Sequence, residues 1–267
     1  MALTDKLTAI GDAIREKEGS TGLIALSDMP SRIQALSSGG GDDPVRKSVL
    51  DIMSGRGSYF NFVIPAGAKE IPEGMFSNWQ NIGAITYEDD SQITKIGQNA
   101  FLNCGNIQMD RLPSGFADNQ ITYQCFKGAG SVSLSKGLPE GITVISTSAF
   151  EECWNLQLTT LPSTVTEIMN SAFRYAYSEY APNLPEMLTL PAGLQTIGQN
   201  AFSGVALKKI RFLGTPTSIN KYTFSSSPAI TDIYVPWMQT TTVGAVAPWG
   251  ATNATIHYNV SPDEVIA

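Results

Sequence analysis

An isoleucine followed five positions later by a phenylalanine recurs seven times along the middle of the chain. The pairs are Ile71/Phe76, Ile96/Phe101, Ile121/Phe126, Ile145/Phe150, Ile168/Phe173, Ile197/Phe202 and Ile219/Phe224. Successive phenylalanines are 22 to 29 residues apart, which is too short a period for two-helix repeats. One unit cannot bury its own isoleucine and phenylalanine, so the pattern predicts stacked units that share one continuous core.

Each unit also carries strand and turn signals. Pro65, Pro139, Pro162 and Pro191 each lie 11 residues before a repeat phenylalanine. Alternating apolar segments run into proline at Phe62–Pro65, Leu188–Pro191 and Ile233–Pro236, and proline suits a strand end because it donates no ladder hydrogen bond. We therefore expect an α/β repeat solenoid, with a parallel β-sheet face and a one-turn or 3₁₀ helix around each phenylalanine.

The segments "LPAGLQTIGQNAFSG", "ITKIGQNAFLNC" and "LPSTVTEIMNSAF" resemble the BspA-like leucine-rich repeat family. The resemblance covers about Phe62 to Pro236 and implies a leucine-rich-repeat solenoid. It also implies that Cys104 and Cys153, each three residues after a repeat phenylalanine, point into the core. No CxxC pair is present, so all three cysteines are expected to be reduced core residues.

The first 38 residues follow a different pattern. Apolar residues at Leu3, Leu7, Ile10 and Ile14 form a helical stripe, and a second short helix is expected before a glycine-rich break. This predicts four regions: a helical hairpin at 1–38, a linker and capping segment at 39–60, seven repeats at 61–236 and a C-terminal cap at 237–267, with Trp237 and Trp249 sealing the open end. The stripe serves either assembly or N-terminal capping of the solenoid.

Both ends resemble phage proteins. "LTDKLTAIGDAIREKEGSTGLIALSDMPSRIQAL" is similar to the openings of tail-fibre and other tail proteins of phages and prophages of Gram-positive hosts. "IYVPW" and the later "APWGATNATIHYN" look like closing segments of the same group. This resemblance implies a virion tail protein that docks on a tail or baseplate component. It also implies a homo-oligomer, with a trimer expected because fibres of that class commonly are trimers.

The charge and hydropathy of the chain argue against two classes of function, nucleic-acid binding and membrane insertion. With 17 basic and 24 acidic residues the net charge is −7, which argues against nucleic-acid binding. No apolar run approaches the length of a membrane span, and the charged N-terminal helix does not read as a signal peptide, so we expect synthesis in the cytoplasm without membrane insertion.

Candidate chemistry is sparse. His257 is the only histidine, which leaves few options for metal or triad sites. The acidic run Glu88–Asp90 suits a cation, and Glu151-Glu152 suits half of a carboxylate pair, but both are more often solvated turns. No nucleophile, base and orienting group converge in the sequence. We expect no enzyme activity, no cofactor and no resident metal.

Two surfaces are candidates for recognition. The longest repeat step, from Phe173 to Phe202, contains a loop with Tyr175, Tyr177 and Tyr180, and tyrosine suits sugar and protein contacts. One or two of these tyrosines could instead cover the core. The competing surface is the sheet face, where alternation places Thr189, Arg211 and Tyr234 outward.

Two functions of different class follow. The favoured one is a phage or prophage tail-fibre protein, located in the virion, that displays the repeats to a host cell-surface glycan or protein. The alternative is a bacterial leucine-rich-repeat surface adhesin or interaction module, in which the hairpin is only a cap.

Overall fold

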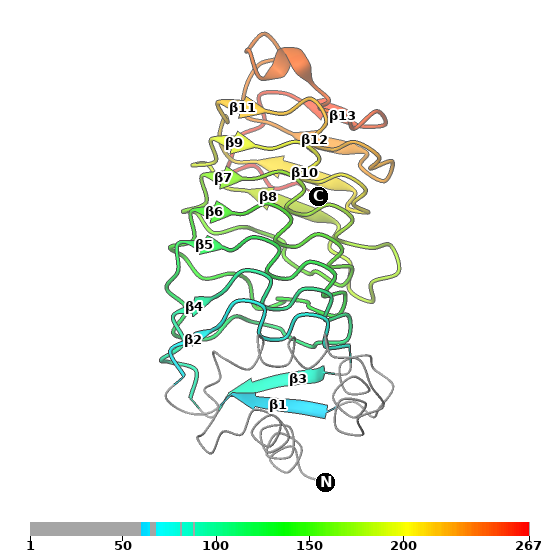
Figure 1. Ribbon diagram of the computed structural model, residues 1–267. Coiled ribbons are helices and arrows are strands. Elements are labelled where there is room, and N and C mark those ends of the chain that lie inside the picture. The colour runs from blue at the N-terminus through cyan, green and yellow to red at the C-terminus, as the bar shows by residue number, and fades with distance from the viewer. Residues whose placement is uncertain (1–59, 65–67, 81, 88, 267) are drawn as a thin grey trace, which may run out of the picture.

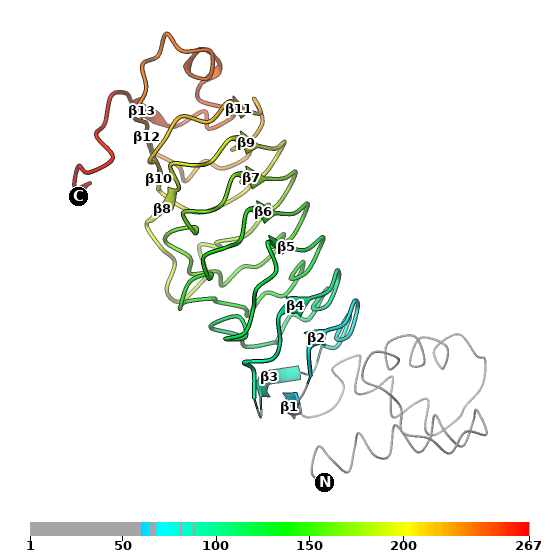
Figure 2. The ribbon, with the colours of Figure 1, turned by 90° about the vertical axis from the view of Figure 1, so that its left-hand side faces the viewer.

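The described part of the chain is an elongated stack of coils in which every strand pairing is parallel. The computed structural model describes residues 60–64, 68–80, 82–87 and 89–266. Figures 1 and 2 show the coils rising from β1 at one end to β13 at the other. The expected parallel solenoid is confirmed. The hairpin at 1–38, with Leu3, Leu7, Ile10 and Ile14, lies outside the described residues.

One side of the stack carries the longer strands. β1 (Phe60–Ile64) pairs with β3 (Ile82–Tyr87), and a four-stranded sheet runs in the order β13 (Thr255–His257), β12 (Asp232–Tyr234), β10 (Lys209–Phe212) and β8 (Met187–Leu190). Between β3 and β8 only isolated bridges are formed, Ala84 with Gln108 and Thr160 with Thr189. The sheet face expected from the proline-ended segments is therefore regular only toward the two ends of this side.

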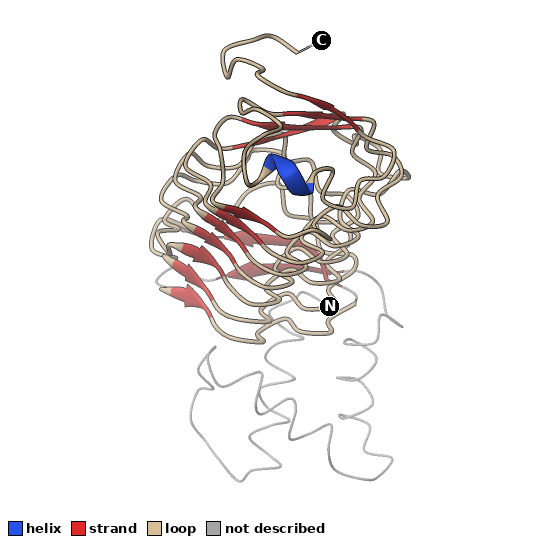
Figure 3. Cartoon of the chain, turned by 90° about the horizontal axis from the view of Figure 1, so that it is seen from above, coloured by secondary structure: helices blue, strands red, loops and turns tan. Residues whose placement is uncertain are grey.

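A second side carries two-residue strands that the sequence did not predict. They are β2 (Glu70–Ile71), β4 (Lys95–Ile96), β5 (Gln120–Ile121), β6 (Val144–Ile145), β7 (Glu167–Ile168), β9 (Thr196–Ile197) and β11 (Ser218–Ile219). Each ends on the isoleucine of a repeat pair, and each of these isoleucines is buried. Figure 3 shows the two groups of strands on different sides of the coil.

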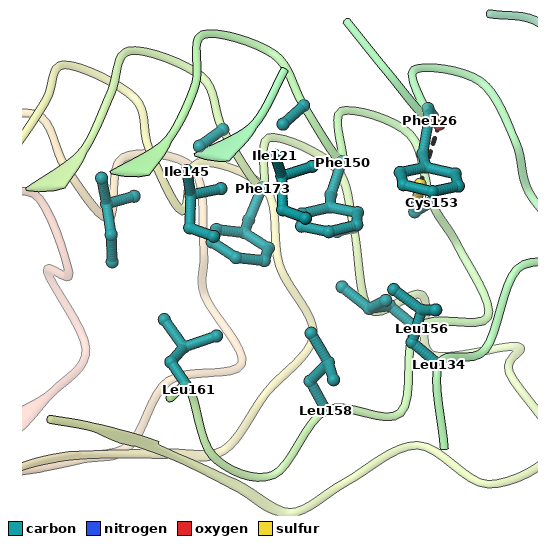
Figure 4. Packing of buried hydrophobic residues seen from close by; sticks show 14 of the residues in the cluster. Ile121, Phe126, Leu134, Ile145, Phe150, Cys153, Leu156, Leu158, Leu161 and Phe173 are labelled. Carbon is teal, nitrogen blue, oxygen red and sulfur yellow. Dashed lines mark hydrogen bonds between the residues drawn. The ribbon is translucent and has the colours of Figure 1, made fainter. Parts of the chain in front are cut away.

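The seven repeat phenylalanines form one internal column, as expected. All seven side chains are fully buried. Neighbouring rings are stacked with centroids 4.9–5.6 Å apart and interplanar angles of 4–21°. Figure 4 shows Phe126, Phe150 and Phe173 facing Leu134, Leu156 and Leu158 across the interior. Offset stacking of this kind adds to the area that each ring buries.

The helical turns expected around the phenylalanines are absent from the described coils, where η1 (Gly244–Val246) is the one helical element. The reason is backbone conformation. The residue two positions before the phenylalanine is left-handed at Asn99, Gln124, Ser148, Ser171 and Asn200, with φ of 49–56°. A left-handed residue breaks a right-handed helix, so these segments are turns.

The turns are instead bonded from coil to coil. The Phe101 N–H donates to the Cys125 carbonyl at 2.9 Å, and the Phe150 N–H donates to the Ala172 carbonyl at 2.7 Å. The thiol of Cys153 donates to the carbonyl of Phe126 in the preceding coil at 3.0 Å (Figure 4), and the Ser227 hydroxyl makes the equivalent bond to Phe202 at 2.8 Å. The turns thus form a third ladder along the stack.

Glycine begins two of these turns because the coils approach closely there. A Cβ at Gly97 would lie 2.4 Å from the backbone nitrogen of Glu73, and one at Gly198 would lie 2.6 Å from the backbone nitrogen of Asn170. Neither position has positive φ. Space for the preceding coil, and not an unusual backbone angle, requires glycine at both.

Tryptophans occupy the core near both ends of the column. Trp79 packs edge-on against Phe76 with centroids 6.0 Å apart. Trp249 is fully buried beside Phe224 and Trp237, and its indole N–H donates to the Val243 carbonyl at 3.2 Å. Trp237 and Trp249 therefore lie where residues that seal the last coil are expected, since a solenoid end must cover its core.

Candidate ligand-binding groove

Between β3 and β8, on the side of the longer strands, the chain keeps an alternating pattern without forming regular strands. Ile107, Met109, Val132, Leu134, Leu156 and Leu158 point into the core. The residues between and beside them are partly or fully exposed: Asn106, Gln108 and Asp110 in one coil, Ser131, Ser133 and Ser135 in the next, and Asn155, Gln157 and Thr159 in the third. Three adjacent coils therefore present a polar array.

Backbone hydrogen bonds hold these segments in register. The Ser131 N–H donates to the Gly105 carbonyl at 3.1 Å, and the Ser133 N–H donates to the Met109 carbonyl at 3.0 Å. The Gln157 N–H donates in turn to the Ser133 carbonyl at 2.8 Å. Because the amides bond along the stack, the side chains of successive coils lie in rows.

These rows line a groove with a volume of about 1060 Å³. The long repeat step contributes residues 178 and 180–183 to its lining, and Ala84 and Ile85 line it at the β3 end. The other lining residues are Gln108, Met109, Asp110, Gly130, Ser131, Ser133, Ser135, Trp154, Asn155 and Gln157. The groove thus crosses five successive coils.

Two aromatic side chains stand in this groove. The Trp154 side chain packs over Gly130 of the preceding coil, where an added Cβ would lie 2.8 Å from the indole Cε3. Trp154 nevertheless stays 53% exposed, and Tyr180 is 87% exposed. Because the Trp154 ring is held against Gly130 and still has a large uncovered area, it offers a contact surface on which a ligand would cost little side-chain freedom.

The groove carries little charge. Asp110 is the one ionisable acid among its lining residues, and none of them is a lysine or an arginine. The remaining polar groups are hydroxyls and amides, which both donate and accept hydrogen bonds. Such a lining suits an uncharged polar ligand.

The three loop tyrosines lie in three different environments. Tyr180 lines the groove. Tyr175 is 41% exposed, but it lies against Gly204 with the Arg174 guanidinium 4.7 Å from its ring centre, and it does not line the groove. Tyr177 does not project and follows the core-covering alternative: its side chain is buried, and its hydroxyl donates to the Leu158 carbonyl at 3.2 Å. A buried phenol has no contact area left for a ligand.

The competing sheet row is assembled as expected from alternation. Arg211 stands in register with Thr189 on one side and with Tyr234 on the other. The Arg211 guanidinium, however, donates to the carbonyl oxygens of Ser261 at 3.2 Å and Pro262 at 2.7 Å. A ligand on this row would have to displace that C-terminal segment.

Two of the acidic residues singled out in the sequence, Asp90 and Glu151, have partners within the chain. Asp90 accepts hydrogen bonds from Ser114 Oγ and Arg111 Nη1, each at 2.5 Å. Burial opposes the charged form of Asp90, but these bonds outweigh it and hold the pKa of the carboxyl below its usual range. Glu151 is buried between Lys127 Nζ at 3.0 Å and Arg174 Nη1 at 3.4 Å. Both carboxylates are engaged in structural contacts.

The cysteines are free and buried, as predicted. Burial raises the pKa of the Cys104 thiol to about 12 and raises that of Cys153 well above its usual value. A thiol in this state is a poor nucleophile. Within the described ranges, no three His, Cys, Asp or Glu residues come together in a way that could hold a metal ion.

The stacked parallel coils, the isoleucine strands and the phenylalanine column define the class of the protein as a leucine-rich-repeat solenoid. The chain belongs to the BspA-type leucine-rich repeat family: residues 55–179 and 175–247 match the family described as "BspA type Leucine rich repeat region", in six copies. No curated protein sequence matches the chain. Among the described residues, no helix combines the length and the apolar character that a membrane span requires.

The solved structures that are similar to the chain include the following three. The first is a leucine-rich cell surface protein from Faecalibacterium prausnitzii A2-165, with 16% identity, 77% of this chain and 83% of that one covered, and a TM-score of 0.36. The second is a leucine-rich repeat protein from Bacteroides ovatus ATCC 8483. Its identity is 15%, the match covers 74% of this chain and 69% of that one, and the TM-score is 0.38. The third is the pneumococcal vaccine antigen PcpA. Its identity is 18%, the match covers 77% of this chain and 68% of that one, and the TM-score is 0.29.

Proposed function

We propose that this chain is a non-catalytic recognition module that binds a cell-surface ligand in the groove between β3 and β8. One observation carries the proposal: Trp154 and Tyr180 stand exposed beside rows of amide and hydroxyl groups that the repeat stack holds in register. Exposed aromatic side chains are typical anchors of recognition surfaces, and Trp154 is in addition held against Gly130. Repeat arrays suit this role because stacking creates a long binding surface.

We propose two settings in which this module acts. A bacterial leucine-rich-repeat surface adhesin or interaction module needs only the repeat family and the groove, and it is our main proposal. A phage or prophage tail fibre uses the same groove against a host receptor, and it is favoured by the resemblance of the two terminal segments to tail proteins. In that setting, Leu3, Leu7, Ile10 and Ile14 would join copies of the chain or a tail component.

Adsorption to intact cells tests the module itself. Labelled full-length protein is incubated with candidate host cells, and bound protein is measured for the parent, Trp154→Ala, Tyr180→Ala and Tyr222→Ala. Tyr222 is a matched control because it is 46% exposed and does not line the groove. We expect about 10-fold weaker adsorption for each groove variant. Unchanged adsorption of both groove variants would refute the proposal.

Fractionation separates the two settings. In the adhesin setting the protein is recovered with the cell envelope of the producing strain. In the tail setting it is recovered with purified virions after prophage induction, and mass spectrometry detects it there beside other tail proteins.

A further inference from the structure

We infer that the ligand of the groove is a neutral oligosaccharide that lies along the stack, across successive coils. This inference rests on the proposed function and adds the chemical class of the ligand. Three features of the groove carry it: its lack of cations, the spacing of its polar rows and its uncovered indole.

The charge of the groove disfavours anionic ligands. Polymers rich in phosphate or carboxylate are held by arginine and lysine, and no lining residue is basic. Asp110 adds a negative charge at the groove, and the chain as a whole carries −7. Long-range electrostatics would therefore repel such a polymer. An uncharged ligand avoids this cost.

The backbone of the groove disfavours an extended peptide. A peptide that adds to a sheet needs free N–H and C=O groups along an edge. Here the Ser131, Ser133 and Gln157 amides already donate to carbonyls of the preceding coil. The ligand must instead be recognised through side chains, and hydroxyls and amides offer the mixed donors and acceptors that sugar hydroxyls require.

The spacing of the rows suits a chain of sugar rings. The Phe101, Phe126 and Phe150 rings, which mark three coils that contribute to the groove, have centroids 5.2 and 5.5 Å apart. This rise is close to the length of one pyranose residue in an extended glycan. Ser131, Ser133, Asn155 and Gln157 therefore repeat at nearly the period of the sugar chain. The volume of about 1060 Å³ exceeds that of most single-ligand pockets, which is room for several rings.

The indole of Trp154 supplies the apolar contact that a sugar needs. One face of a pyranose is formed by C–H groups and is less polar than its hydroxyl edge. That face can pack on an aromatic ring while the edge is hydrogen-bonded. Trp154 lies over Gly130 at mid-groove, with Asn155 and Gln157 following it in the same coil. The geometry thus places a stacking surface beside hydrogen-bonding groups.

Treatment of the target cells distinguishes a glycan from a protein ligand. Cells are exposed to periodate, which cleaves vicinal diols of sugars, or to a broad protease, and adsorption of the full-length chain is then measured. We expect periodate to reduce adsorption at least about 10-fold and the protease to leave it unchanged. Loss on protease treatment with no effect of periodate would overturn the inference. If Trp154→Ala still abolished adsorption in that case, the proposed function would stand.

Competition then tests the charge of the ligand. Glycans released from the same cells are separated on an anion exchanger into neutral and anionic fractions. The neutral fraction should compete for adsorption, and competition by the anionic fraction alone would overturn the inference. Adsorption should also change little between low and high ionic strength, because a neutral ligand has no charge to screen. Trp154→Phe should restore part of the adsorption lost in Trp154→Ala, and thermal melting of each variant checks that it is folded.

Discussion

The amide N–H of Phe224 donates to the carbonyl oxygen of Trp249 at 2.9 Å. Earlier phenylalanines make the same bond to the residue that precedes the next phenylalanine, such as Ala100 for Phe76 and Ala201 for Phe173. Trp249 therefore supplies the carbonyl that an eighth coil would have supplied. The C-terminal segment ends the turn ladder by imitating one more repeat.

Truncation in the middle of the column should destabilise the fold strongly. Phe150 is fully buried and stacks on Phe126 at 5.5 Å and on Phe173 at 5.3 Å. We expect Phe150→Ala to lower the free energy of unfolding by about 3–5 kcal/mol, because a cavity would open between two coils. Thermal and denaturant melting measure the change, with the exposed Tyr222→Ala as control. An unchanged melting midpoint for Phe150→Ala would show that the column is not core.

Acid should weaken a contact between two strands at the C-terminal end. His257 and Thr231 hydrogen-bond the Asp232 carboxylate at 2.7 and 2.8 Å, and these bonds lower its pKa. A carboxyl whose folded pKa is lowered stabilises the fold above its unfolded pKa of about 3.9, and this contribution is lost as pH falls through the folded value. The stability gap between the parent and Asp232→Asn should therefore shrink between about pH 5 and pH 2.

Melting curves recorded across that pH range check the prediction. Asp263→Asn, which changes an exposed carboxylate of the C-terminal segment, is the control. A gap between the parent and Asp232→Asn that stays constant down to the lowest pH would show that the contact contributes no pH dependence.

Deletion of residues 1–38 should change assembly and leave the repeats folded. The expected stripe of Leu3, Leu7, Ile10 and Ile14 has little core of its own, so its burial requires a partner. We expect circular dichroism of the repeats to be nearly unchanged while light scattering reports a smaller species than the full-length chain. A full-length chain that is monomeric at high concentration would favour the capping role of the stripe.

Replacement of the sheet row should leave adsorption intact. In the triple variant Thr189→Ala, Arg211→Ala, Tyr234→Ala, the groove residues Trp154 and Tyr180 are untouched. The Arg211 guanidinium already binds backbone carbonyls of the C-terminal segment, so its loss should affect that segment more than ligand binding. Cell adsorption compared with that of Trp154→Ala checks this. Loss of adsorption only in the triple variant would move the binding surface to the sheet row.

The sequence predicted the core better than the surface. The fixed interval between isoleucine and phenylalanine predicted the column because core positions tolerate few side chains. The turn geometry was not predictable from that interval, since Asn, Gln and Ser at the left-handed positions also occur in short helices. Proline-ended segments predicted three of the longer strands, β1, β8 and β12, but gave no sign of the two-residue strands, which exist only through pairing with neighbouring coils.

The groove was only partly predicted. Tyr180 was singled out through the long repeat step. Loop length does not say which side chain turns inward, so the sequence left open which of the three tyrosines covers the core, and Tyr177 is the one that is buried. Trp154 was missed because it directly follows Cys153, which was expected to point into the core. Two signals in the sequence pointed to it. The equivalent positions in the two preceding coils are Gly105 and Gly130, and polar residues alternate with apolar ones after each of the three.

Every ladder in this stack advances by one coil at a time, so the length of the groove can change only in steps of one whole coil. A duplication or deletion of one whole unit of 23 to 25 residues would keep the isoleucine, phenylalanine and groove positions aligned. A single-residue insertion would disturb all of them or be expelled as a loop. Recombination between repeats can therefore lengthen or shorten the groove in steps of one row, and related chains with different repeat numbers would differ in the length of ligand that they prefer.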